Sequence, residues 1–158
     1  MITANQGLTL VETMLVLLLL GIATTLALPA FDSVRTGAKI DGAAAWLLGD
    51  IRYAQSLAIR TQKTCTIAFD PVNETYRLLD QNGIVVQHPL TRQAYQVNFN
   101  AMQQFKGIDL VAATFGASSN LSFGTLGAPQ TGGVVTLRYA NRQRAINVLY
   151  PSGRIVLQ

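Results

Sequence analysis

Glu12 is the residue whose position most needs a chemical explanation. It is the only charged side chain between residues 8 and 28, where every other residue is apolar or small and uncharged. A helix over this stretch would be about 31 Å long, close to the hydrocarbon thickness of a bilayer. A carboxylate costs roughly 2.5 kcal/mol or more at mid-bilayer and less near the edge. Glu12 therefore indicates a function, and its partner has to be found.

The other residues that could do chemistry are few and dispersed. The chain has one cysteine, Cys65, and one histidine, His88. One cysteine excludes an internal disulfide, and the two residues lie too far apart in the sequence for metal-ligand spacing. Cys65 lies in "TCTIAF", whose alternation predicts a small buried strand residue. Because no nucleophile elbow, phosphate loop or acid pair is present either, the sequence predicts no enzyme, no metal and no cofactor.

The charge distribution is uneven along the chain. The net charge is +4, and Asp109 is the last acidic residue. The basic residues that follow it are Arg138, Arg142, Arg144 and Arg154. One interpretation is that they solubilise the outer face of a sheet, and the other is an anionic partner such as DNA or lipid headgroups.

The apolar stretch predicts the first half of a long helix that ends near residues 60 to 62. Pro29 removes one backbone donor and is expected to kink this helix. Beyond it, apolar residues approximate one stripe, with Asp50 among the polar residues on the other sides. The predicted stripe comprises Phe31, Val34, Ala38, Ala45, Leu48, Ile51, Tyr53, Leu57 and Ala58.

From Lys63 onward the pattern has a period of two, which is typical of strands. Residues 64–70 and 75–80 flank "PVNE" and predict a hairpin. Further strands are expected at 84–87, 96–100, 107–113 and near 120, followed by a meander over 134–140, 144–150 and 154–158. One long helix packed on an antiparallel sheet gives an α+β fold.

The stretch "GLTLVE" resembles the prepilin signal of type IV pilins and the pseudopilins of type II secretion. In that family a membrane peptidase cuts after the glycine and methylates the new N-terminus, which here implies cleavage between Gly7 and Leu8 and methylation of Leu8. Glu12, Gly21 and Pro29 then occupy positions that the family uses. A secretory signal would instead carry a basic first segment, and "MITANQG" has none.

The resemblance implies three parts: a prepilin leader over residues 1–7, a transmembrane half-helix over 8–28 and a periplasmic pilin-like domain over 29–158. It also implies a partner for Glu12. The charged α-amine created on Leu8 of one chain would pair with the Glu12 carboxylate of a neighbouring subunit, which offsets the cost of each charge in a low-dielectric bundle.

The stretch from Leu48 to Phe69 and the ending "YPSGRIVLQ" are similar to the GspH/FimT branch of minor pseudopilins and minor pilins. One cysteine leaves no C-terminal disulfide loop, and no acid after Asp109 can build a C-terminal calcium loop. Both features favour a minor subunit. FimT-like pilins bind DNA during uptake, so candidate DNA-binding residues are Arg142, Arg144 and Arg154.

The resemblance therefore implies a minor pseudopilin of type II secretion, with a FimT-like DNA-binding minor pilin as the alternative. The expected location is the inner membrane, with a single span and the C-terminal domain in the periplasm. The expected partners are a prepilin peptidase, other pilin or pseudopilin subunits, the membrane, and either secreted cargo or DNA.

Overall fold

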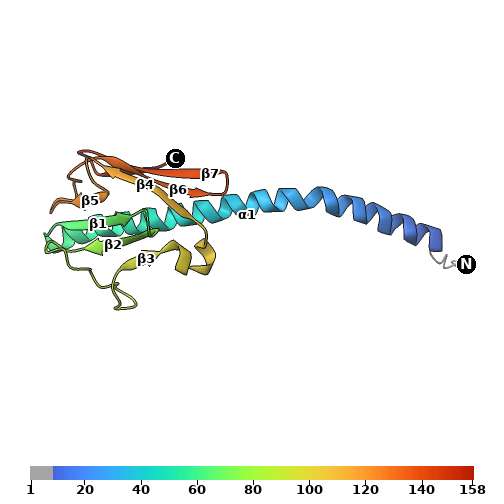
Figure 1. Ribbon diagram of the computed structural model, residues 1–158, viewed down its shortest axis with the longest axis horizontal. Coiled ribbons are helices and arrows are strands. Elements are labelled where there is room, and N and C mark those ends of the chain that lie inside the picture. The colour runs from blue at the N-terminus through green and yellow to red at the C-terminus, as the bar shows by residue number, and fades with distance from the viewer. Residues whose placement is uncertain (1–8) are drawn as a thin grey trace, which may run out of the picture. The chain divides into compact units, whose positions relative to one another are not determined.

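The computed structural model describes residues 9–158, apart from the side chains of residues 26–32. Its contacts divide the chain into two units, Met1–Arg35 and Thr36–Gln158. Helix α1, Leu10–Thr61, contributes to both units (Figure 1). The predicted end of the helix near residues 60 to 62 is confirmed.

The unit Thr36–Gln158 contains eight strands in two antiparallel sheets (Figure 1). The first sheet has the order β3-β2-β1-β5 and the second the order β4-β6-β7-β8. The strands are β1 Cys65–Asp70, β2 Thr75–Leu79, β3 Gln96–Asn98, β4 Asp109–Phe115, β5 Asn120–Phe123, β6 Gly133–Tyr139, β7 Arg142–Leu149 and β8 Arg154–Leu157. Two short 3₁₀ helices, η1 Phe99–Ala101 and η2 Gln103–Phe105, join β3 to the second sheet.

The predicted α+β fold is confirmed, with two sheets where one was expected. The β1–β2 hairpin has the predicted turn, in which the backbone N–H of Asn73 donates to the Asp70 carboxylate. The meander of β6, β7 and β8 is also confirmed. The strand predicted over residues 84–87 is wrong, because Val85 and Gln87 form only isolated bridges.

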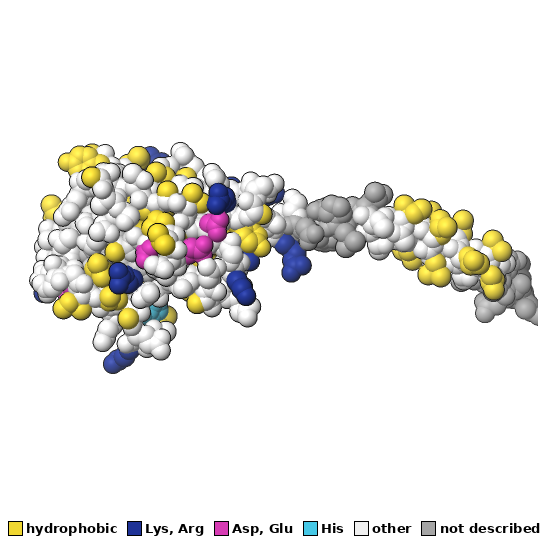
Figure 2. Space-filling model, viewed as in Figure 1, with side chains coloured by type: hydrophobic (Ala, Val, Ile, Leu, Met, Phe, Trp, Pro, Cys, Tyr) yellow, Lys and Arg dark blue, Asp and Glu magenta, His cyan; other side chains and the backbone are white. Residues whose placement is uncertain are grey.

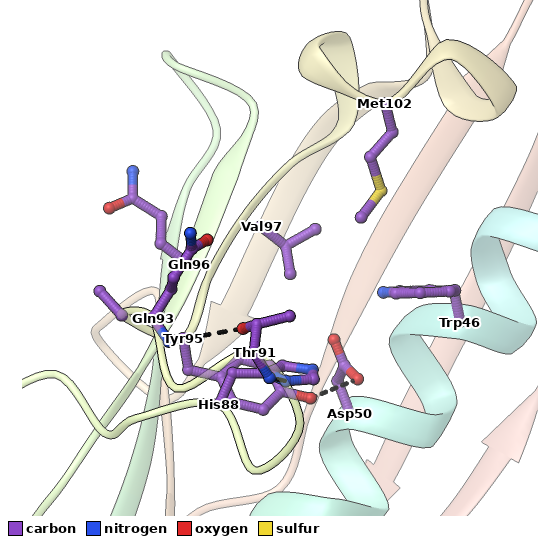
Figure 3. Close-up of a pocket in the computed structure, with 10 residues that line it drawn as sticks. Trp46, Asp50, His88, Thr91, Gln93, Tyr95, Gln96, Val97 and Met102 are labelled. Atoms are coloured by element: carbon purple, nitrogen blue, oxygen red, sulfur yellow. Dashed lines mark hydrogen bonds between the residues drawn. The ribbon is translucent and has the colours of Figure 1, made fainter.

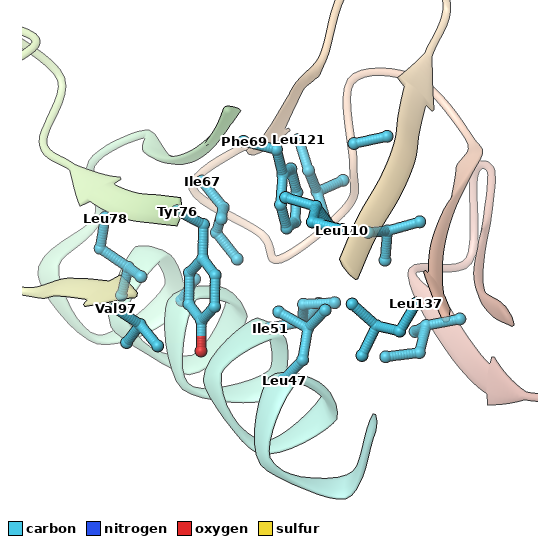
Figure 4. Close-up of a cluster of buried hydrophobic side chains, with 14 of the residues drawn as sticks. Leu47, Ile51, Ile67, Phe69, Tyr76, Leu78, Val97, Leu110, Leu121 and Leu137 are labelled. Atoms are coloured by element: carbon cyan, nitrogen blue, oxygen red, sulfur yellow. The ribbon is translucent and has the colours of Figure 1, made fainter. Parts of the chain in front are cut away.

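Side chains from α1 and from both sheets converge in a single core (Figure 4). The predicted stripe on α1 is partly wrong, since Ile51 and Ala58 are buried whereas Val34 is 69% exposed and Ala45 lies at the surface. The buried face of the helix comprises Ile40, Ala43, Ala44, Leu47, Asp50, Ile51, Ala54 and Ala58. Packing against two sheets buries a wider arc than one stripe, which is why the sequence pattern was ambiguous.

Candidate functional site

The described part of the first unit is a helix with one acidic residue at its start. The Thr9 hydroxyl accepts a hydrogen bond from the backbone N–H of Glu12 at 3.3 Å and so caps α1. Glu12 therefore lies in the first turn, where a negative charge is favoured by the helix dipole. Gly7 and Leu8, the predicted cleavage and methylation residues, lie outside the described residues.

Large apolar side chains of this segment are exposed all round the helix, since consecutive residues from Met14 to Leu20 are all exposed. Figure 2 shows such side chains on the face in view. Those from Leu10 to Ile22 are 48 to 75% exposed. Gly21 has no neighbour within 4 Å of an added Cβ. At Pro29 the backbone is helical, while its side chain lies outside the described residues, so the predicted kink stays a prediction.

Within the described residues, no helix has the length and apolar character that crossing a membrane requires. The predicted span over residues 8–28 begins and ends in residues that are not fully described.

Two of the candidate DNA-binding arginines lie on the inner face of the second sheet. Arg142 and Arg144 share the face of β7 that carries Ile146 and Val148, both of which are buried. The Arg144 guanidinium forms an ion pair with Asp41 of α1 at 2.6 Å. The Arg142 guanidinium packs against Gly37, where an added Cβ would lie 3.0 Å from Nη1. The expectation that these arginines solubilise an outer face is therefore wrong.

The third candidate, Arg154, lies at the other end of the strand. It is exposed, and it pairs with Leu149 across the β7–β8 ladder. Leu149 lies five residues after Arg144 in β7, which corresponds to about 17 Å along the strand. The meander therefore does not bring Arg142 and Arg144 beside Arg154.

Gly153, which precedes Arg154, is required by the close approach of two loops. Its φ is +67°, and an added Cβ would lie 2.9 Å from the Gly127 carbonyl oxygen. The Gln55 side-chain amide of α1 donates to the carbonyls of Gly127 and Gly153 at 2.8 and 3.3 Å. Packing on the helix therefore explains the glycine in the ending "YPSGRIVLQ".

The carboxylate of Asp50, which the sequence analysis placed on a polar face of the helix, is buried and is contacted by side chains from two other segments. Asp50 of α1 is 9% exposed. Its Oδ2 accepts a hydrogen bond from the Tyr76 hydroxyl at 2.5 Å, and its Oδ1 accepts one from the Tyr95 hydroxyl at 2.9 Å. The two tyrosines come from β2 and from the loop before β3, so three separate segments meet at one carboxylate.

Asp50 also lines a cavity of about 330 Å³ (Figure 3). The His88 ring lies 4.6 Å from the Tyr95 ring, centroid to centroid, and Trp46 forms the opposite wall. His88 Nδ1 accepts the backbone N–H groups of Leu90 and Thr91, which shapes the loop that closes one side.

Burial is the dominant influence on the ionisation of Asp50, Tyr76 and Tyr95. It raises the pKa of the Asp50 carboxyl, and the hydrogen bonds from Tyr76 and Tyr95 act in the opposite direction by stabilising the charged form. Burial and the neighbouring carboxylate raise the pKa of Tyr76 well above its ordinary value and raise the pKa of Tyr95 as well. Both phenols are therefore neutral donors at physiological pH.

Cys65 is 2% exposed, as the sequence predicted, and burial raises the pKa of its thiol to about 11. A thiol with such a pKa is a packing residue with little nucleophilic character at neutral pH.

Comparison with known families identifies the domain. Residues 43–150, well over half of the chain, match the family described as type II transport protein GspH. The chain belongs to the GspH family. Gly7, Glu12, Gly21 and Arg154 all lie outside the matched range. The family assignment is therefore independent of the prepilin-like signal. The resemblance to the GspH/FimT branch is confirmed.

Solved structures show the same fold as this GspH-family chain. The minor pseudopilin EpsH from the type 2 secretion system of Vibrio cholerae aligns with a TM-score of 0.57 and 12% identity, covering 76% of this chain and 96% of that chain. The type IV minor pilin FimU of Pseudomonas aeruginosa aligns with a TM-score of 0.52 and 16% identity, covering 75% and 87%. No curated protein matches the sequence significantly.

Sequence reasoning missed the Asp50 cluster. Its one sequence signal is helical spacing, because Asp50 lies three residues after Leu47 and four before Ala54, in the same buried row. The partners Tyr76 and Tyr95 carry no signal of their own, since only the tertiary fold brings them to the helix.

Proposed function

We propose that this GspH-family chain is a minor pseudopilin of a type II secretion filament, a structural subunit rather than an enzyme. It is cut between Gly7 and Leu8 by a prepilin peptidase and methylated on Leu8. Residues 8–28 anchor it in the inner membrane, and residues 29–158 form the periplasmic domain. Its partners are other pseudopilin subunits and, through the assembled filament, secreted protein cargo.

The observation that carries this proposal is a helix with exposed apolar side chains on every side and one carboxylate in its first turn, joined to a GspH-type domain. A helix that is apolar all round needs lipid or other helices around it. In that environment the Glu12 carboxylate needs a cation, and the α-amine of Leu8 in a neighbouring subunit has the right charge and depth.

The test is expression of the full chain with a prepilin peptidase, followed by intact mass measurement and N-terminal sequencing. We expect a chain that starts at Leu8 and carries one added methyl group, about 14 Da. Glu12→Gln should leave this processing intact and reduce incorporation into filaments. Thr24→Ala is the matched control, because the Thr24 hydroxyl donates to the carbonyls of Leu20 and Gly21 in its own helix. An uncut chain, or one that starts near Pro29, would overturn the proposal.

The alternative function is DNA binding by a FimT-like minor pilin through Arg142, Arg144 and Arg154. The ion pair of Arg144 with Asp41 and the separation of Arg154 from the other two weigh against a shared phosphate-binding surface. A gel-shift experiment at low salt tests it, since phosphate contacts by a few arginines give salt-sensitive binding. Loss of a shift in Arg154→Gln with the fold intact would favour this alternative, and no shift at low salt would remove it.

A further inference from the structure

Asp50 is a buried carboxylate whose electrostatic attraction to the nearby His88 is a smaller influence than burial and the hydrogen bonds from Tyr76 and Tyr95. Arg138 pairs with Asp109 and Arg144 pairs with Asp41, so these two arginines are engaged by other carboxylates. The hydroxyls of Tyr76 and Tyr95 stabilise the charge by hydrogen bonding but do not neutralise it. A buried charge is normally paired, so the arrangement is suited to a cation supplied from outside.

The space beside this carboxylate has aromatic walls. Figure 3 shows the Asp50 side chain projecting between Tyr95 and Trp46, with Val97 and Met102 on the adjoining side of the cavity. Trp46 is 40% exposed, so the cavity is reached from solvent along an indole surface. Its volume of about 330 Å³ is at the lower end of the range for ligand pockets, which suits one large side chain.

We propose that this cavity binds an arginine side chain presented by another protein. A guanidinium is planar, stacks on aromatic faces and donates several hydrogen bonds to a carboxylate. The partly exposed indole of Trp46 offers a surface for stacking, and the Asp50 carboxylate offers the hydrogen-bond acceptor. The Tyr95 ring is already packed between Tyr53 and His88, so it closes the cavity and does not stack on the guanidinium. The proposal does not depend on the proposed secretion role, because it concerns only what the cavity recognises.

The composition of the cavity argues against other occupants. An anion would meet the Asp50 carboxylate, which repels it. A purely apolar side chain would leave that carboxylate buried without a counter-charge, at a cost that arginine avoids. Lysine is a point charge that is more strongly hydrated and lacks a plane to stack on Trp46. Arg92, the basic residue of the adjoining loop, is not among the residues that line the cavity.

Trp46 provides a direct probe, because it is the only tryptophan of the chain. The full chain in mild detergent is titrated with N-acetyl-arginine amide, and Trp46 fluorescence is recorded. N-acetyl-citrulline amide, the neutral analogue of nearly the same shape, is the matched control at equal ionic strength. The titration extends to about 100 mM, well beyond the ~1 mM range of weak complexes. We expect a saturable change with the arginine compound alone.

Two kinds of variant connect the signal to the cavity. Asp50→Asn should weaken arginine binding by about tenfold or more, since the charge is lost. Gln93 lines the cavity and is exposed, so it can be changed without affecting the core. Gln93→Arg should abolish binding by repulsion, and Gln93→Glu should strengthen it. If Asp50→Asn does not fold, the Gln93 pair alone decides.

Three results would overturn the proposal. One is the absence of any saturable change with the arginine compound. Another is an equal response to the citrulline compound, which would show an occupant recognised by shape alone. The last is binding that Gln93→Arg and Gln93→Glu leave unchanged. None of these results bears on cleavage at Gly7 or on filament assembly.

Discussion

Removal of the Tyr76 hydroxyl tests the account of the Asp50 cluster. Tyr76 is fully buried, and its hydroxyl donates to Asp50 at 2.5 Å, so Tyr76→Phe deletes one oxygen and one hydrogen bond to a buried carboxylate. Hydrogen bonds to charged groups contribute about 1.5 to 3 kcal/mol. We expect the free energy of unfolding to fall by about 2 kcal/mol, which lowers Tm by about 8 °C for a domain of this size.

The matched control is Tyr150→Phe, which removes the same hydroxyl from a side chain that is 65% exposed. Its effect should stay within about 0.5 kcal/mol. Both variants are measured as full chains in mild detergent by thermal and denaturant unfolding. Equal losses in the two variants would contradict the assignment of a stabilising hydrogen bond to Tyr76.

The effect of Tyr76→Phe should also depend on pH. The hydroxyl stabilises the ionised carboxylate, so its removal raises the folded-state pKa of Asp50 further above the ordinary value of 3.8. The destabilisation is therefore fully present above that folded-state pKa and shrinks as the pH falls through it. In the unsubstituted chain, the raised pKa means that the contribution of Asp50 to stability declines as the pH rises from 3.8 through the folded-state pKa. If the difference in free energy of unfolding between Tyr76→Phe and the unsubstituted chain stays constant down to acid pH, the hydrogen bond from Tyr76 to an ionised Asp50 carboxylate is refuted.

Three further predictions concern packing and surface charge. Gly133→Ala should lower the free energy of unfolding by about 3 kcal/mol or more, because its Cβ would lie 2.1 Å from a backbone carbonyl oxygen. Gly49→Ala, whose Cβ would meet open space, should instead stabilise α1 by up to about 1 kcal/mol. Denaturant unfolding measures both variants, and similar effects would contradict the prediction. Cys65 should resist iodoacetamide at pH 8 in the folded chain, because it is buried and burial raises its pKa to about 11, and it should react fully in denaturant. Intact mass measures the labelling, and rapid labelling of the folded chain would refute the burial of Cys65. Arg144→Gln should lower the free energy of unfolding by about 0.2 to 1 kcal/mol, and by less at high salt. In a double-mutant cycle its effect on stability should not add to that of Asp41→Asn, and full additivity would argue against the ion pair.

The sequence predicted the elements that follow a regular period. The long helix, the first hairpin and the last three strands each have a clear pattern, and the structure contains all of them. The residues "AAAWLL" from 43 to 48 are apolar on every side, so periodicity could not determine the helix face that becomes buried. That choice depends on contacts with two sheets, which are formed by residues distant in the sequence.

The candidate functional residues also fall into those that a local sequence pattern indicated and those that only the tertiary fold brings together. The N-terminal residues Gly7, Leu8 and Glu12 form a linear motif, and their roles, which stay predictions, were inferred from its resemblance to a prepilin signal. The Asp50 cluster joins side chains 26 and 45 residues apart, and no linear pattern connects them. One of the two interpretations placed Arg142 and Arg144 on the outer face of a sheet, but strand parity places them in the row of Ile146 and Val148.

The separation of the domain into one helix and two sheets has a mechanical consequence. Strand hydrogen bonding is confined within each sheet, so the helix and the sheets are held together by shared side-chain packing and by a few polar contacts, such as those of Gln55 and Asp50. A pull along the axis of α1 would load the buried apolar row from Ile40 to Ala58 in shear, against both sheets at once. Resistance to extraction of the helix is therefore distributed over many small contacts, and it scales with the area of the core rather than with the strength of any single bond.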